Sequence, residues 1–234
     1  MAGEPDAVGE ATAPAVDPEL PIGESRWPPA LALLAFMTIN IALRVWLPND
    51  SPVRVAWLVP AIEGVLLAIL LLGPATVPES RRWVRRIAVT FVLVLVLAAL
   101  WATVLLIYDL IEGSGVTESP RELLASGGVV WLGNNLSFAL LYWLMDGGGP
   151  LARARRPPRA VDFAFTQQMD PELAPGWRPV FLDYLHLGFT NATAFSPTDV
   201  MPLTLRAKYT MVVQASVALA LFGLIVARAV NTFN

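Results

Sequence analysis

The sequence predicts an all-α membrane protein, a polytopic helical bundle of five to six transmembrane helices. The clearest observation is the run Ile87–Ile107, which contains no charged residue and is flanked by arginines on one side and acidic residues on the other. A helix rises about 1.5 Å per residue, so roughly 20 apolar residues cross the hydrocarbon of a bilayer. A helix of a soluble core would carry polar residues at helical spacing, and this run has almost none.

The composition supports the same class. Of the 234 residues, 56% are hydrophobic and 15% are charged, whereas soluble domains have about 25% charged residues. The formal net charge is only −3, so no global field favours a nucleic acid as a partner. The chain contains no cysteine, which excludes disulfides, thiolate metal sites and cysteine nucleophiles.

The chain divides into four regions. Residues 1–25 are rich in Ala, Pro and acidic side chains and lack Lys and Arg, which predicts a disordered acidic tail. A four-helix transmembrane region is expected over 26–146, and a cytoplasmic basic, proline-rich loop over 147–179. Residues 180–234 are expected to hold a short helix, a polar turn and a final transmembrane helix.

Five hydrophobic segments are expected to be membrane helices, because lipid offers no water to an open backbone. They are Pro28–Trp46, Val55–Leu72, Ile87–Ile107, Gly128–Met145 and Tyr209–Ala227. A sixth, Phe181–Pro197, is shorter and more polar, and the sequence leaves open whether it spans the membrane or re-enters it. Tryptophans at segment edges are typical of an aromatic belt; they are Trp27, Trp46, Trp83 and Trp143.

Arginine-rich loops predict the orientation. One loop contains four arginines between residues 81 and 86, and another contains RARRPPR at 153–159. Two crossings separate these loops, so they lie on the same side, and the positive-inside rule places that side in the cytoplasm. The predicted location is the cell membrane, multi-pass, with a cytoplasmic N-terminus.

Glu63 lies near the middle of the second segment, three residues after Pro60. A carboxylate at this depth costs about 2.5–3.5 kcal/mol on insertion scales. Proline removes a helical hydrogen bond and leaves a carbonyl free nearby. Two interpretations stay open, namely an ion or proton pathway residue and a structural pair with Arg44 or Arg54.

Polar residues are densest around the sixth segment. They include Asp183, His186, Thr190, Asn191, Thr193, Ser196, Thr198 and Asp199. Asp183 and His186 are three residues apart and share a helical face, but no second histidine or cysteine exists to complete a zinc site. The sequence therefore predicts no metal and no cofactor. The cluster is either a pathway site or a polar hairpin between two ordinary spans.

Residues 183–231 also resemble a known arrangement. A short aromatic-rich helix carrying Tyr184 and Phe189 precedes a Thr-rich turn, then come Asp199, Pro202 and Arg206, and an apolar helix ends in Val-Ala-Arg at 226–228. This layout resembles the C-terminal part of uncharacterised bacterial multi-pass membrane proteins, and through them the pore module of two-helix potassium channels. The filter pattern T-V-G-Y-G-D is degenerate, because residues 193–199 read TAFSPTD and contain no glycine.

These observations give two function hypotheses. The first is a channel- or transporter-like protein that moves a small ion or solute past Glu63 and the polar residues of 183–199. The resemblance implies a homo-oligomer, a tetramer in the channel case. The second is a non-catalytic membrane subunit that binds a partner protein. No phosphate loop, nucleophile elbow or metal-ligand set occurs, so an enzyme is not expected.

Overall fold

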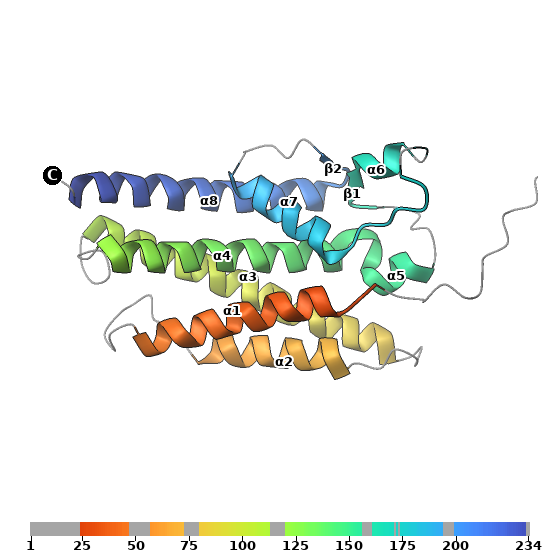
Figure 1. Cartoon of the computed structure of the whole chain (residues 1–234), viewed down its shortest axis with the longest axis horizontal. Coiled ribbons are helices and arrows are strands. Elements are labelled where there is room, and N and C mark those ends of the chain that lie inside the picture. The colour runs from red at the N-terminus through yellow and green to blue at the C-terminus, as the bar shows by residue number, and fades with distance from the viewer. Residues whose placement is uncertain are drawn as a thin grey trace, which may run out of the picture.

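A computed structural model describes residues 24–46, 57–72, 80–112, 120–155, 161–170, 172, 174–193 and 199–232. Its long helices lie along one axis and form an elongated bundle (Figure 1). The elements are α1 (Trp27–Trp46), α2 (Leu58–Leu72), α3 (Ser80–Glu112), α4 (Pro120–Met145), η2 (Asp146–Gly148), α5 (Pro150–Arg155), β1 (Phe163–Phe165), α6 (Thr166–Met169), α7 (Phe181–Thr193), β2 (Val200–Pro202) and α8 (Leu205–Thr232). Residues 1–23 of the expected tail lie outside the described residues.

Three of the described helices are long and apolar enough to cross a membrane. They are Arg85–Glu112 in α3, Leu123–Gly148 at α4 and Leu205–Arg228 in α8. The expected all-α fold is therefore confirmed, and these three segments are candidate membrane spans by length and composition. Helices α1 and α2 are apolar but shorter, so a count of five to six spans stays a prediction.

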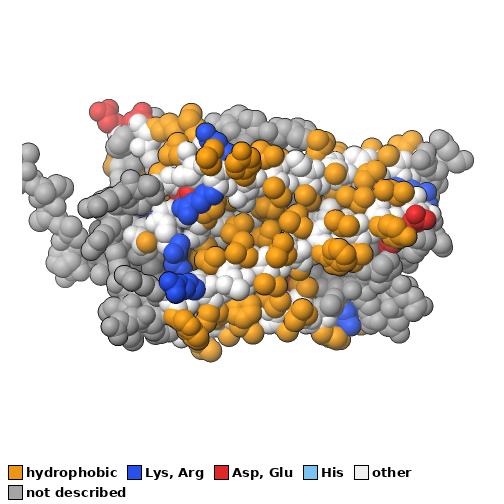
Figure 2. Space-filling model, turned by 180° about the vertical axis from the view of Figure 1, so that it is seen from behind, with side chains coloured by type: hydrophobic (Ala, Val, Ile, Leu, Met, Phe, Trp, Pro, Cys, Tyr) orange, Lys and Arg blue, Asp and Glu red, His pale blue; other side chains and the backbone are white. Residues whose placement is uncertain are grey.

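α4 is the central helix of the bundle. In its span 67% of the most apolar window is buried, against 28% in α3 and 22% in α8. Figure 2 shows one face of the molecule, with hydrophobic side chains over its middle. Most of the visible basic side chains lie toward one end. Trp27 and Trp83 are exposed, as a belt requires, but Trp143 is only 4% exposed. Its assignment to the belt was wrong, because its indole is bound inside the bundle.

Gly133 marks a close approach between α4 and α1. A Cβ atom added there would lie 2.7 Å from Cζ of Phe36, so Gly133→Ala is expected to destabilise the protein by about 1–3 kcal/mol through overpacking. Gly128→Ala on the same helix is the matched control, since nothing lies within 4 Å of its added Cβ and alanine favours helix by up to about 1 kcal/mol. Thermal unfolding in detergent compares the two; equal melting temperatures would contradict this packing.

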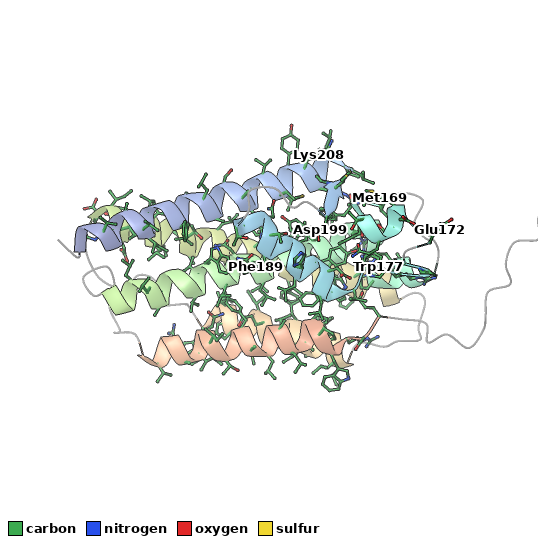
Figure 3. All side chains as sticks on the ribbon, turned by 45° about the horizontal axis from the view of Figure 1, so that its top comes forward. Met169, Glu172, Trp177, Phe189, Asp199 and Lys208 are labelled. Atoms are coloured by element: carbon green, nitrogen blue, oxygen red, sulfur yellow. The ribbon has the colours of Figure 1, made fainter. Side chains whose placement is uncertain are left out.

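α7 belongs to a hairpin that enters the bundle and returns to the same end. β1 pairs antiparallel with β2, with Phe163 opposite Pro202. The Thr166 N–H donates to the Asp199 carbonyl at 3.1 Å, so the segment between these residues starts and finishes at one place. Figure 3 follows this path from Glu172 and Trp177 at the end of the bundle to Phe189 farther inside and back to Asp199. The described part of the sixth segment, α7, therefore does not cross the bundle from one end to the other.

Candidate functional site

The depth of α7 in the bundle follows from its contacts with α4. The Phe181 ring packs edge-on against Trp143 near the end of α4, with centroids 5.8 Å apart. Gly188 lies farther in, where an added Cβ would be 3.3 Å from the Asn135 carbonyl oxygen. Asn135 is halfway along the span Leu123–Gly148. α7 therefore reaches the middle of the span at Gly188 and continues five residues farther, to Thr193.

One face of α7 exposes polar side chains at this level. The imidazole Nε2 of His186 lies 3.2 Å from the carboxylate Oδ2 of Asp199, and these side chains are 59% and 37% exposed. Thr193 is exposed as well, and its hydroxyl donates to the Phe189 carbonyl at 2.9 Å. The Thr190 hydroxyl donates to the His186 carbonyl at 3.0 Å. The structure thus brings these four predicted site residues onto one surface.

The opposite face of α7 is held by an amide network. Gln214 of α8 accepts through Oε1 from the Tyr142 hydroxyl at 2.7 Å and from the Asn191 amide at 2.8 Å. The Gln214 amide donates to the Gly188 carbonyl at 3.0 Å. All three side chains are buried, so Asn191, a predicted pathway residue, fixes α7 between α4 and α8.

Asp183 and Glu63, two further predicted site residues, form hydrogen bonds outside the His186–Asp199 pair. Asp183 accepts the Val180 N–H at 2.7 Å through Oδ2 and so caps the first turn of α7. Glu63 lies on α2 and accepts from the Asn40 amide of α1 at 2.8 Å. It shares no contact with His186 or Asp199, because α2 lies on the far side of α1 and α4 from α7 (Figure 1). Ser196 and Thr198 fall in residues 194–198, outside the described residues.

Sequence reasoning missed a buried polar network at the entrance of α7, centred on Asp146. Its Oδ1 accepts the N–H groups of Asp162 at 2.7 Å and Phe163 at 3.2 Å, and its Oδ2 accepts the Tyr184 hydroxyl. Asp146 is fully buried. One carboxylate therefore joins the end of α4 to β1 and to α7.

Arg153 closes the same network. Its Nη1 donates to the carbonyls of Trp143 at 2.9 Å and Asp146 at 2.7 Å, and its guanidinium lies 5.0 Å from the Tyr184 ring centroid. A cation bound to the last carbonyls of α4 suits the helix C-terminus. The chain must turn sharply after α4 for Arg153 to reach the carbonyls at the end of that helix. Gly147, Gly148 and Gly149 form this turn, with positive φ angles of 56°, 87° and 92°.

Glu24, just before α1, completes the entrance network. Its carboxylate accepts the Trp143 indole N–H at 2.8 Å and the Phe181 backbone N–H, and lies 3.5 Å from Arg153 Nη2. Nearby, Asp162 is fully buried and accepts twice from Arg206, at 2.6 Å each, and once from the Thr204 hydroxyl at 2.6 Å. These bonds hold both ends of the α7 hairpin to the bundle.

The sequence carried a partial signal for this network. Asp146 follows an apolar segment and precedes three glycines, which indicates a carboxylate at a helix end and a sharp turn. Nothing in the sequence indicates that Asp162 or Glu24 is buried, because both lie in polar, proline-containing surroundings where a solvated carboxylate is the ordinary case.

Glu24 predicts a pH dependence of stability. Burial raises its pKa above the usual 4.5, although the bonds from Trp143 and Phe181 and the charge of Arg153 act in the opposite direction. The folded state then binds a proton more readily than the unfolded state, so the stability due to this group is complete below pH 4.5 and is lost as pH rises through the folded pKa. We expect the stability of the wild type relative to Glu24→Gln to decrease from pH 4.5 upward. Thermal unfolding in detergent measures it, and a difference that increases with pH would contradict the assignment.

The site offers hydrogen-bonding groups and an exposed His186–Asp199 pair. The described part of the chain holds no group of three or more His, Asp or Glu residues placed to bind a metal ion. Comparison of the chain with models of protein families, with curated proteins and with solved structures gives no match.

Proposed function

We propose that this chain is a channel- or transporter-like membrane protein that moves a small ion or solute along the exposed face of α7. The observation that carries the proposal is the His186–Asp199 pair. Its imidazole belongs to His186, two residues before Gly188, the residue of α7 that meets the middle of the α4 span. Exposing an imidazole and a carboxylate to hydrocarbon at that level is costly. The face they share is therefore assigned to water or to a permeating species.

The backbone supports the same assignment. Helix α7 ends at Thr193, and the chain is back at the β1–β2 pair by Val200. A helix that reaches the middle of the α4 span, followed by a return to the end of the bundle by Val200, favours a re-entrant α7. The proposed topology has five spans, α1, α2, α3, α4 and α8, with α7 re-entering from the cytoplasmic, arginine-rich side.

The pathway lies on the outside of a single copy, so it must be closed by another subunit. α8 supplies a long apolar surface beside it, with Tyr209, Phe222 and Val230 all more than half exposed. We therefore propose a homo-oligomer, a tetramer in the channel case, whose copies enclose the α7 faces around a common path.

Flux into liposomes tests this proposal. Asp199→Asn and His186→Gln remove the imidazole–carboxylate contact with little change of shape, and each is expected to alter the flux of the conducted species by about tenfold, or ~1.4 kcal/mol in the barrier. Glu172→Gln is the matched control, because Glu172 is exposed and precedes α7. Absence of flux for common cations, anions and small solutes would overturn the proposal.

The alternative is a non-catalytic membrane subunit, and one observation favours it. Apolar side chains are exposed beside the two-stranded sheet, outside the three candidate spans, namely Met169, Met201 and Leu203 at 49%, 56% and 52%. Such a surface suits a partner protein. Recovery of one stoichiometric partner, lost in Met201→Ser, together with no flux, would establish this function instead.

A further inference from the structure

A second polar site lies between α1 and α2, apart from the face of α7. Glu63 is 0% exposed and Asn40 is 2% exposed. The Asn40 amide Nδ2 donates to Glu63 Oε1 at 2.8 Å. The other carboxyl oxygen, Oε2, is buried and has no hydrogen-bond partner among the residues that the structure describes.

No described cation compensates Glu63. α2 packs against α1 and α3, and the charged residues with described side chains on those two helices are Arg44, Arg85, Arg86, Asp109 and Glu112. None of them forms an ion pair with Glu63 in the described structure. The Arg44 guanidinium lies 4.6 Å from the Trp57 ring centroid. The structural pair with Arg44 is therefore not formed, and Arg54 lies outside the described residues.

Burying an ionised Glu63 without a cation costs free energy, because the carboxylate loses its water and gains only one neutral hydrogen-bond donor. A neutral carboxyl fits the contacts. It needs one donor at its carbonyl oxygen, which Asn40 provides, and it carries the proton on the other oxygen. A metal cation would need several more oxygen ligands, and the described residues place no group of three or more His, Asp or Glu side chains together.

We propose that Glu63, with Asn40 as its hydrogen-bond donor, is a proton-binding site inside the membrane. Glu63 is five residues from the start of α2 at Leu58 and nine from its end at Leu72, or about 8 Å and 14 Å along the helix. Protons therefore exchange from the end of the bundle opposite the arginine-rich end. The inference rests on contacts that the α7 pathway does not share, so it stands whether or not the protein conducts.

Labelling with dicyclohexylcarbodiimide tests the site in the full-length protein in detergent. The carboxyl O–H adds across one C=N bond of the reagent, and the O-acylisourea rearranges to a stable N-acylurea without loss of any group. The reaction needs a protonated carboxyl. Peptide mapping by mass spectrometry is expected to find the adduct at Glu63 at pH 7 and to find less of it as the pH rises. Asn40→Ala removes the hydrogen-bond donor that favours the ionised form of Glu63. Labelling of Glu63 in this variant is therefore expected to persist to more alkaline pH.

Two comparisons make the result decisive. A water-soluble carbodiimide is expected to modify the exposed Glu172 and to leave Glu63 unmodified. Glu63→Gln replaces a neutral carboxyl by a neutral amide of the same shape, so it is expected to lose the adduct and keep the melting temperature at pH 7. An unlabelled Glu63 in folded wild-type protein, or a marked fall in melting temperature for Glu63→Gln, would overturn the proposal. Neither readout depends on flux.

Discussion

Asp146→Ala is expected to lower the free energy of unfolding by about 3–5 kcal/mol. The change leaves three buried donors without an acceptor, the N–H groups of Asp162 and Phe163 and the Tyr184 hydroxyl. Each unsatisfied buried group costs about 1–3 kcal/mol. Because these donors come from Asp162, from the first residue of β1 and from α7, the damage reaches the whole α7 hairpin.

Asp146→Asn is the matched control. An asparagine Oδ1 can still accept both backbone N–H groups, and the Tyr184 hydroxyl can turn to accept from the amide. We expect a loss of only about 1 kcal/mol. Unfolding by SDS in mixed micelles, followed by tryptophan fluorescence, compares the variants. Equal losses for alanine and asparagine would show that the acceptor at this position is not what holds the hairpin.

The second large effect is expected at the ion pair that anchors the start of α8. Arg206→Ala leaves the Asp162 carboxylate buried, with the Thr204 hydroxyl as its remaining donor among the described residues. Removing one partner of a buried pair costs about 3–5 kcal/mol; we expect about 3 kcal/mol, since the 60% exposure of Arg206 shows that water reaches the pair.

The opposite substitution is expected to cost less. Asp162→Asn leaves an arginine that is already largely exposed and can be hydrated, so a loss of about 1–2 kcal/mol is expected. The double variant Arg206→Ala/Asp162→Asn should then be more stable than Arg206→Ala alone. A double-mutant cycle in the same unfolding assay measures this coupling; strictly additive losses would contradict a buried charge at Asp162.

The parts of the fold that could be predicted from the sequence are those fixed by continuous apolar runs. Ile87–Ile107, Gly128–Met145 and Tyr209–Ala227 each lie inside one of the three candidate spans, because a run of that length has few alternatives to a membrane helix. The path of 181–197 could not be predicted. Whether it crosses or returns depends on the pairing of Phe163–Phe165 with Val200–Pro202, and strands of three residues leave no periodic pattern.

The candidate site was predictable in its residue types but not in its arrangement. His186 and Asp199 are thirteen residues apart in the sequence, and they meet because the chain turns back after α7. Asn191 and Asp183 sit on the same short helix, yet one is buried against Gln214 and the other caps the first turn. Which face of a thirteen-residue helix is buried depends on its neighbours, and a single sequence does not specify them.

The central claim is that α7 enters and leaves the membrane on one side, and cysteine labelling tests it most directly because the natural chain has no cysteine. Glu172→Cys and Leu203→Cys place exposed thiols before and after the hairpin. Glu112→Cys places a thiol at the last residue of α3, at the end of that helix opposite its arginines. In sealed, oriented vesicles a membrane-impermeant maleimide is expected to reach Glu172→Cys and Leu203→Cys from the same side, and Glu112→Cys from the other. Labelling of Glu172→Cys and Leu203→Cys from opposite sides would contradict the re-entrant hairpin.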